Sequence, residues 1–166
     1  CAACGLVVLS PLFLITALAV GLTSPGGILF CQERIGLGGK PFIIYKFRTM
    51  RKENSGLKIT ASGDDRITPV GRILRKTKLD ELPQLFNVLR GDMSFVGPRP
   101  EVQEYTDLYT EEQRQVFLVR PGITGVASIR YRNENDLLAA SDDPNRTYIQ
   151  EILPEKLRLD LSYIPR

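Results

Sequence analysis

The chain has 166 residues, of which 43% are hydrophobic and 25% are charged, so it is long enough to bury the core of one globular domain. The net charge is only +3 and no motif interleaves aromatic with basic residues, which argues against a nucleic-acid binder. The absence of histidine excludes a Cys–His nucleophile, and the three cysteines do not support a disulfide framework or a structural zinc site. Any chemistry must therefore rest mostly on carboxylates, lysines and arginines.

Charge is distributed unevenly along the chain. No charged residue precedes Glu33, cations dominate from Arg34 to Arg90, and acids return after Glu101. This asymmetry predicts a basic surface that faces phosphates, either of a substrate or of lipid headgroups, although an ordinary solvated face is the alternative for any single lysine. Because the chain begins inside an apolar run and ends without a helix cap, we expect both ends to be cut from a longer chain.

The first segment, Cys1 to Leu22, is almost wholly apolar and could cross a hydrocarbon core, which needs roughly 20 apolar residues. Ser10-Pro11 interrupts it. A proline removes one backbone hydrogen bond and bends a helix, and the Ser10 hydroxyl could bond the freed carbonyl. The residues leave three outcomes open: a kinked span, which the length favours, a re-entrant helix that enters and leaves by the same face, or a buried helix of a soluble protein.

Periodicity and breaker residues predict an α+β, helix-rich fold for the rest of the chain. Thr68-Pro69 is a helix start, and Gly91 is a helix stop. Up to Gly91 the expected elements are strands at 28–32 and 42–48 around a basic glycine-rich turn at 34–41, a polar loop at 51–65, and helices at 67–79 and 83–89. Beyond it we expect an irregular loop at 92–100, a helix at 101–119, a strand at 126–131, and helices at 135–140 and 145–161 with a boundary at Leu153-Pro154.

Two adjacent carboxylates, Asp80 and Glu81, follow a run of cations and precede Pro83. If Pro83 begins a helix, both lie just outside its N-terminus, where the helix dipole favours anions and where phosphate could also bind. An aspartate can attack phosphorus covalently, and Mg²⁺ with Lys and Arg can stabilise the transferred group. The residues thus suggest phosphoryl chemistry at a membrane surface, with an ordinary charged helix surface as the alternative.

Four segments in this order closely resemble the bacterial sugar transferase family, the monotopic phosphoglycosyl transferases: Tyr45–Met50, Leu79–Val88, Gly91–Pro100 and Arg120–Gly125. Ser10-Pro11 resembles the break in that family's re-entrant helix, and the resemblance covers nearly the whole chain. It implies a monotopic membrane protein, with a re-entrant helix at residues 1–22 and a small cytosolic catalytic domain with short strands at 23–166. The first is expected to be truncated at its N-terminus and the second at its C-terminus.

The resemblance also implies an activity. Such enzymes move a sugar 1-phosphate from a UDP-sugar to polyprenol phosphate, here undecaprenyl phosphate, giving polyprenyl-diphosphate-sugar and UMP. This initiates the synthesis of bacterial exopolysaccharide, capsule or lipopolysaccharide O-antigen at the cytosolic face of the inner membrane. The partners implied are the UDP-sugar, polyprenol phosphate and membrane lipid, with homo-oligomer formation left open.

By resemblance, Asp80 is the nucleophile and Glu81 its supporting partner, and both are candidate ligands of the cofactor Mg²⁺. Lys46, Thr49, Arg75 and Arg99 match positions around the phosphates, and Arg130, Arg132 and Asn133 are candidates for nucleotide or sugar contacts. The stretch from Ser128 to Asn133 departs from the family's usual Gln-Val-Asn-Gly-Arg-Asn. A competing hypothesis is a membrane-surface binding or scaffold module that uses a basic lipid-facing patch without catalysis.

Overall fold

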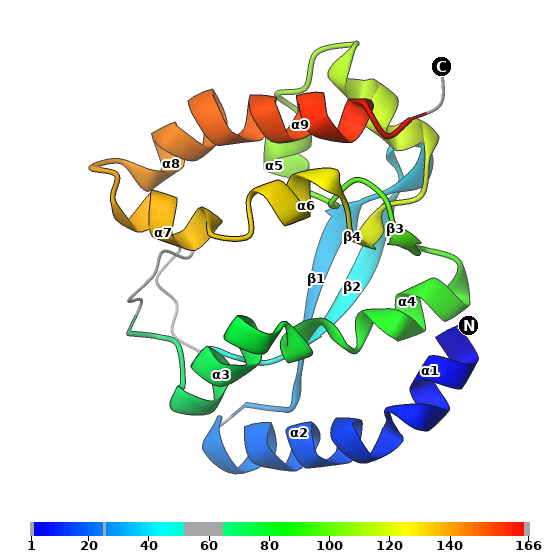
Figure 1. Ribbon diagram of the computed structural model, residues 1–166, viewed down its shortest axis with the longest axis vertical. Coiled ribbons are helices and arrows are strands. Elements are labelled where there is room, and N and C mark those ends of the chain that lie inside the picture. Colours follow the sequence, from blue (N-terminus) through cyan, green and yellow to red (C-terminus); the bar gives the residue numbers. More distant parts are fainter. Residues whose placement is uncertain (1, 25, 52–64, 165–166) are drawn as a thin grey trace. The chain divides into compact units, whose positions relative to one another are not determined.

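The computed structural model describes residues 2–24, 26–51 and 65–164 (Figure 1). The predicted loop at 51–65 lies, apart from its two ends, outside the described residues. The chain divides into two compact units, which are treated separately below. Among the described residues, the first unit holds 2–24, 26–32, 43–51 and 65–91, and the second holds 33–42 and 92–164. This division follows packing, whereas the predicted boundary after residue 22 concerns membrane insertion and stays a prediction.

A two-stranded hairpin runs through both units. It consists of β1 (Leu29–Ile35) and β2 (Pro41–Phe47), joined by a single 3₁₀ turn, η1 (Leu37–Gly39). Both strands and the glycine-rich turn between them were predicted, and the structure confirms them. Gly38 and Gly39 have φ of 66° and 71°, a backbone region that residues with a Cβ rarely adopt.

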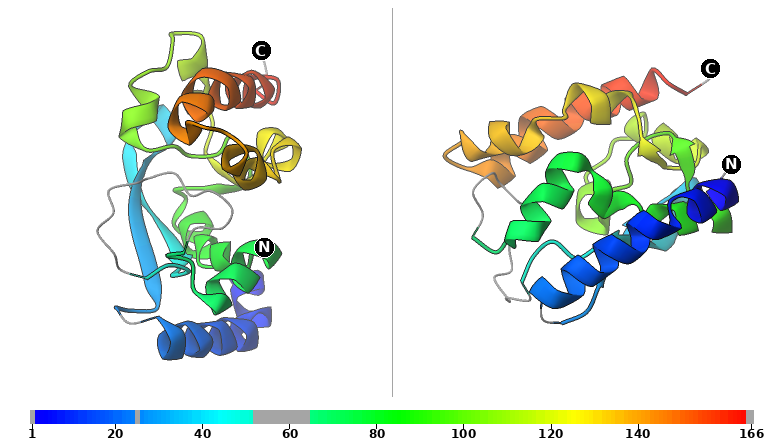
Figure 2. Two further views of the ribbon diagram at one scale, coloured as in Figure 1. Left: turned by 90° about the vertical axis from the view of Figure 1, so that its left-hand side faces the viewer. Right: turned by 60° about the horizontal axis from the view of Figure 1, so that its bottom comes forward.

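The first unit begins with two helices, α1 (Ala2–Val8) and α2 (Ser10–Thr23), which are bent by 65° relative to each other. The bend is visible in the left view of Figure 2, where the two helices form the blue pair. Because Pro11 has no N–H, the carbonyl of Val7 lacks its usual helical donor, and the Ser10 hydroxyl donates to that carbonyl at 2.8 Å. The predicted break at Ser10-Pro11 and the predicted role of the hydroxyl are both confirmed.

Within the described ranges no single helix is long and apolar enough to cross a membrane, but the bent pair passes that test as a unit. One side of α2 packs on the unit's core, where Phe13 contacts the rings of Phe47 and Phe86 at centroid distances of 5.7 and 6.0 Å. The remaining surface of the pair carries large apolar side chains that are more than half exposed, namely Val7, Val8, Leu14, Ile15, Leu18 and Leu22.

The first unit ends with α3 (Pro69–Thr77), a 3₁₀ turn η2 (Leu79–Glu81) and α4 (Gln84–Arg90). The Thr68 side chain accepts a hydrogen bond from the Gly71 N–H at 2.9 Å, so Thr68 caps α3 as predicted. Gly91 ends α4 with φ of 86°, the left-handed conformation typical of a glycine stop. Lys78 also has a positive φ, 59°, and this residue turns the chain from α3 into η2.

The second unit contains a parallel strand pair where an irregular loop was predicted. In it β3 (Ser94–Val96) pairs with β4 (Gly122–Thr124), with Ser94 opposite Gly122 and Val96 opposite Thr124. The pairing depends on close backbone approach, because a Cβ on Gly97 would lie 2.5 Å from the carbonyl oxygen of Arg120. A contact of this kind between distant segments has no local sequence signature, so the prediction of a loop was wrong.

The predicted helix at 101–119 is also wrong. The structure has a short helix α5 (Gln103–Thr106) and a separate 3₁₀ segment η3 (Gln113–Leu118). Between them the Thr110 hydroxyl accepts from the Gln113 N–H, and the Gln113 side chain accepts from the Thr110 N–H at 2.9 Å. This reciprocal pair is a capping box, which starts a new helical segment and so interrupts the longer one.

The predicted strand at 126–131 is instead a helix, α6 (Val126–Arg130). Its first turn is capped from far along the chain, because the Asp160 carboxylate accepts from the Ala127 N–H at 3.4 Å. The β-branched residues favour a strand locally, and this cap together with the complete burial of Ala127 favours the helix.

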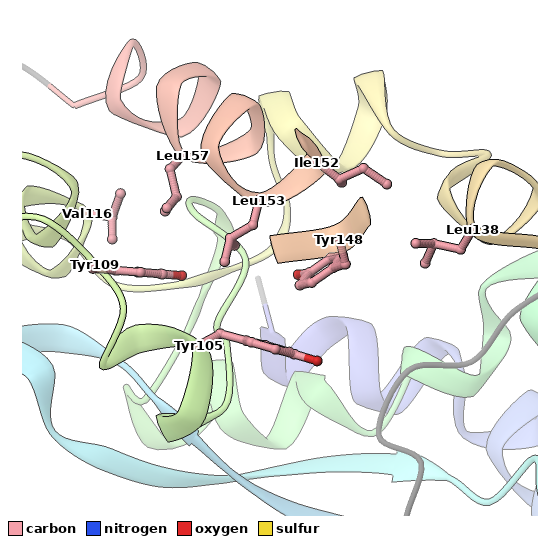
Figure 3. Packing of buried hydrophobic residues seen from close by; sticks show 8 residues of the cluster. All are labelled: Tyr105, Tyr109, Val116, Leu138, Tyr148, Ile152, Leu153 and Leu157. Carbon is pink, nitrogen blue, oxygen red and sulfur yellow. The ribbon is translucent and has the colours of Figure 1, made fainter. Parts of the chain in front are cut away.

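The chain then forms α7 (Glu134–Ala139), α8 (Pro144–Thr147), a π-helical turn η4 (Tyr148–Ile152) and α9 (Leu153–Leu161). The π turn meets α9 at Leu153, so the predicted boundary at Leu153-Pro154 is confirmed. Figure 3 shows the core that these elements enclose with α5 and η3. Its buried members are Tyr105, Tyr109, Val116, Leu138, Tyr148, Ile152, Leu153 and Leu157.

Candidate functional site

The two adjacent carboxylates lie in the single turn η2, between the end of α3 and the start of α4. Asp80 and Glu81 are each only 8% exposed. The left-handed Lys78 directs the chain back after α3, and backbone bonds from Glu81 to Lys78 and from Leu82 to Leu79 close the turn. The predicted placement just before a helix N-terminus is therefore confirmed, and both carboxylates are buried rather than on a solvated helix surface.

Lys46, on β2, forms an ion pair with Glu81. Its Nζ donates to Glu81 Oε1 at 3.0 Å, with 16% of the lysine side chain and 10% of the glutamate side chain exposed. A largely desolvated pair of this kind holds the β2 strand and the η2 turn in a fixed relation, because either charge alone would be costly to bury.

Thr49 and Arg75 form a second contact beside the first. Arg75, on α3, donates through Nε to Thr49 Oγ1 at 2.8 Å. The N-terminus of α3 lies directly on the Thr49 carbonyl, which accepts from the Thr68 N–H at 3.0 Å. A Cβ on Gly71 would be 2.1 Å from the same carbonyl oxygen, so only glycine permits this approach. The contact fixes where the Arg75 guanidinium lies.

Asp80 has an altered acidity. Burial raises the pKa of Asp80 above its ordinary value, and repulsion from Glu81 raises it further, while Lys46, Arg75 and Lys78 act in the opposite direction. The three cations thus favour the ionised form in a place that otherwise disfavours it. Asp80, Glu81, Lys46, Thr49 and Arg75 were all predicted as site residues, and the structure brings them together in one unit.

Two polar atoms in this cluster lack a hydrogen-bond partner among the residues that the structure describes. They are Asp80 Oδ1 and Gln84 Nε2, and both are buried. An orphaned carboxylate oxygen fits a divalent cation. Mg²⁺ typically takes one or two protein carboxylates and completes its octahedron with substrate phosphates and water. No group of three or more Asp, Glu, His or Cys gathers within the described ranges. The carboxylates of this cluster are those of Asp80 and Glu81.

Arg99 belongs to the second unit, in the loop that follows β3. It is partly buried between the buried Pro98 and Pro100. Its backbone N–H bonds the Asp160 carboxylate, which also caps α6. Burial raises the pKa of Asp160 to about 6, against the effect of these two backbone bonds. One carboxylate therefore holds the Arg99 loop and the start of α6 together.

Glu101 anchors the other end of the Arg99 loop. It pairs with Arg34 at 3.2 Å and with Lys156 at 3.6 Å, and it accepts from the Tyr148 hydroxyl at 2.7 Å. Burial alone would raise the pKa of Glu101, but Lys156, Arg34 and that hydroxyl hold it below its usual range. The backbone of Arg99 is therefore held by Asp160, and the same loop is held two residues later by the buried contacts of Glu101.

The remaining predicted residues, Arg130, Arg132 and Asn133, are exposed at the end of α6 and in the turn before α7. Because α6 is a helix and not the expected strand, Arg130 lies in its last turn. Their roles stay predictions.

Sequence reasoning missed two residues. Gln84 stands within the motif that carries the resemblance but was assigned no role, because its burial and its unmet donor are visible only in three dimensions. Asp160 was unremarkable in a charged C-terminal helix.

The whole chain, residues 1–166, matches the family model described as bacterial sugar transferase. It is 44% identical over 160 residues to a UDP-glucose:undecaprenyl-phosphate glucose-1-phosphate transferase of Caulobacter vibrioides, covering 93% of this chain and 56% of that protein. It is 47% identical over 125 residues to a UDP-N-acetylgalactosamine-undecaprenyl-phosphate N-acetylgalactosaminephosphotransferase of Aeromonas hydrophila, covering 72% and 30%. A UDP-glucose:undecaprenyl-phosphate glucose-1-phosphate transferase of Escherichia coli is 41% identical over 165 residues, covering 96% and 33%. The chain therefore spans about a third to a half of the length of these relatives.

Proposed function

This chain belongs to the bacterial sugar transferase family, and we propose that it carries the catalytic part of a phosphoglycosyl transferase. The donor is a UDP-sugar and the acceptor is a polyprenol phosphate, undecaprenyl phosphate in keeping with the names of the relatives. The products are polyprenyl-diphosphate-sugar and UMP. The observation that carries the proposal is the buried Asp80–Glu81 pair, surrounded by Lys46, Arg75 and Thr49.

The reaction proceeds in two displacements at Asp80. An oxygen of the ionised Asp80 carboxylate attacks the β-phosphorus of the UDP-sugar. The bond from that phosphorus to the oxygen bridging the two phosphates breaks, and UMP leaves with the electron pair. The sugar phosphate is then bonded to Asp80, and an oxygen of polyprenol phosphate attacks the same phosphorus and releases the carboxylate. Splitting one difficult transfer into two is the general advantage of covalent catalysis.

The neighbouring side chains keep Asp80 reactive. The cations lower the pKa that burial raises, so that a larger share of Asp80 is ionised at neutral pH. Glu81 holds Lys46 in place, and Thr49 orients Arg75. The two cations can then stabilise charge on the transferred phosphoryl group in a water-poor setting, where such interactions are strong.

Mg²⁺ is the cofactor that we expect, held by Asp80 and Glu81. When bound, it supplies positive charge to the phosphate oxygens of the donor. The orphaned Asp80 Oδ1 supports this assignment.

We further propose that the bent α1–α2 pair enters the membrane as a re-entrant helix and returns to the cytosolic face of the bacterial inner membrane. The fixed break at Ser10-Pro11 and the exposed apolar side chains of the pair support this arrangement. It would allow a soluble nucleotide and a lipid-borne phosphate to reach one interface. Arg99, Arg130, Arg132 and Asn133 are proposed to contact phosphate, nucleotide or sugar, and the pathway served is synthesis of exopolysaccharide, capsule or O-antigen.

The test is UMP release from a panel of UDP-sugars, with the chain in detergent, undecaprenyl phosphate as acceptor and Mg²⁺ present. Intact mass should reveal a sugar-phosphate adduct when the acceptor is omitted. We expect Asp80→Asn to abolish both the adduct and UMP release. Normal turnover by Asp80→Asn would refute the covalent route. Salt-sensitive binding to anionic vesicles without UMP release from any donor would favour the binding-module hypothesis instead.

A further inference from the structure

Gln84 lies in the first turn of α4 and is among the most buried polar side chains of the first unit. Only 1% of its surface is exposed. Its amide nitrogen Nε2 is buried and has no hydrogen-bond partner in the part of the chain that the structure describes. Native proteins rarely leave a buried donor unpaired, because the group has lost its water without gaining a replacement. An unmet donor at a fixed place points to a partner that arrives from outside the chain.

Asn87, one turn later in the same helix, provides the comparison. It is also fully buried, at 0% exposure. Its amide, however, is used on both sides: Nδ2 donates to the Ile43 carbonyl at 2.7 Å, and Oδ1 accepts from the Tyr45 N–H at 3.2 Å. Asn87 thus holds α4 against β2 and has an evident structural purpose. Gln84 makes no equivalent bond through Nε2, so fixing this helix does not account for it.

The position of Gln84 relative to the carboxylates is informative. It follows Asp80 by four residues, and the intervening Leu82 and Pro83 both have right-handed helical backbone angles. Residues four apart in helical turns share a face. The second orphaned atom of the cluster is Asp80 Oδ1, a buried acceptor on the residue four positions before Gln84. Because both atoms lack partners, they do not bond each other, and the segment from η2 to the first turn of α4 holds one buried donor and one buried acceptor that a ligand could use.

We propose that Gln84 is a further catalytic residue, whose amide N–H donates to a non-bridging oxygen of the phosphoryl group that is transferred to Asp80. This inference rests on the proposed function. The phosphoryl group brings several acceptor oxygens to the Asp80 carboxylate. Gln84 can donate a hydrogen bond to one of these oxygens and, because its amide is uncharged, does not repel the neighbouring cations. A hydrogen bond that strengthens as negative charge spreads over these oxygens stabilises the transition state more than the ground state.

The decisive variant is Gln84→Met, which keeps the length and approximate volume of the side chain and removes the amide. Removing an unmet buried donor should leave the midpoint of urea unfolding unchanged or raise it. If the amide contacts the transferred group, kcat and kcat/KM for UMP release should fall together, by about 100-fold, as expected for loss of one preorganised donor. Gln84→Glu replaces the donor by an acceptor, so its kcat and kcat/KM for UMP release should fall at least as far.

Asn87→Leu is the matched control, because it removes a buried amide whose bonds lie within the protein. It should lower the urea midpoint clearly, in contrast to Gln84→Met. The inference is overturned if folded Gln84→Met and Gln84→Glu release UMP at the wild-type rate, or if Gln84→Met destabilises the fold as Asn87→Leu does. Failure of the proposed function gives a different result, since the wild type would then release no UMP from any UDP-sugar.

Discussion

The ion pair between Lys46 and Glu81 leads to the most direct test of the site's construction. Lys46→Met removes the charge and keeps most of the side-chain length. The Glu81 side chain is 10% exposed and loses the partner whose Nζ lies 3.0 Å away. Removing one member of a buried pair costs about 3–5 kcal/mol, and an exposed pair contributes no more than about 1 kcal/mol. Since both side chains keep some access to water, we expect Lys46→Met to lower the free energy of unfolding by about 2–3 kcal/mol.

A double-mutant cycle isolates the pair from the further interactions that both side chains make. The second variant is Glu81→Gln, and the third combines the two. If Glu81 is destabilising mainly when it is charged and unpaired, the double variant should be more stable than Lys46→Met alone. The coupling energy should be about 1–3 kcal/mol, as found for residues in direct contact. Urea unfolding of the purified chain in detergent, followed by circular dichroism, measures all four free energies.

Two results would refute this reasoning. One is a loss below about 0.5 kcal/mol for Lys46→Met, the size of an ordinary surface substitution. The other is strict additivity of the two single changes, which would mean that the pair makes no net contribution at a distance of 3.0 Å.

Gly71→Ala should destabilise the first unit by about 3 kcal/mol, because the new Cβ would lie 2.1 Å from the Thr49 carbonyl oxygen and force α3 to move. An unchanged midpoint of urea unfolding would contradict this. Ser10→Ala should cost about 1 kcal/mol through loss of the hydroxyl bond to the freed carbonyl, and Ser10→Thr should restore it in the same titration. The pKa of Asp160 is raised to about 6 in the folded state from an ordinary value of 3.8, so the folded state binds this proton more tightly than the unfolded chain does. The stability of the wild type relative to Asp160→Asn should therefore fall between pH 4 and pH 8, by at most about 3 kcal/mol, and a flat difference would exclude this titration.

The elements that could be predicted from sequence are those whose determinants are adjacent in the chain. Thr68 and Pro69 start α3, Gly91 ends α4, and Pro11 breaks the N-terminal pair, each through a property of its own backbone or side chain. The capping box of Thr110 and Gln113 is equally local and was overlooked, because the apolar periodicity continued across it.

The other wrong predictions, the loop at 92–100 and the strand at 126–131, depend on distant residues. The helix α6 is capped by Asp160, which lies 33 residues further along the chain than Ala127. In the candidate site, the carboxylates were evident as a sequence motif, and Lys46, Thr49 and Arg75 were identified through resemblance. The ion pair of Lys46 with Glu81 could not be foreseen from spacing, because 35 residues separate its members.

The glycines of the second unit differ in whether a second change elsewhere in the chain could compensate for their substitution by alanine. A Cβ at Gly97, Gly122 or Gly125 would meet backbone atoms at 2.2–2.5 Å. A Cβ at Gly36 would meet side chains alone, namely the ring of Phe42 at 3.0 Å and Pro121 at 3.5 Å, an ordinary contact distance. A smaller residue at position 42 could relieve the crowding at Gly36, but no side-chain exchange removes a carbonyl or an amide. In a library that varies many positions at once, alanine at residue 36 should therefore be recovered in some backgrounds. Alanine at residues 97, 122 and 125 should be absent from every background that folds.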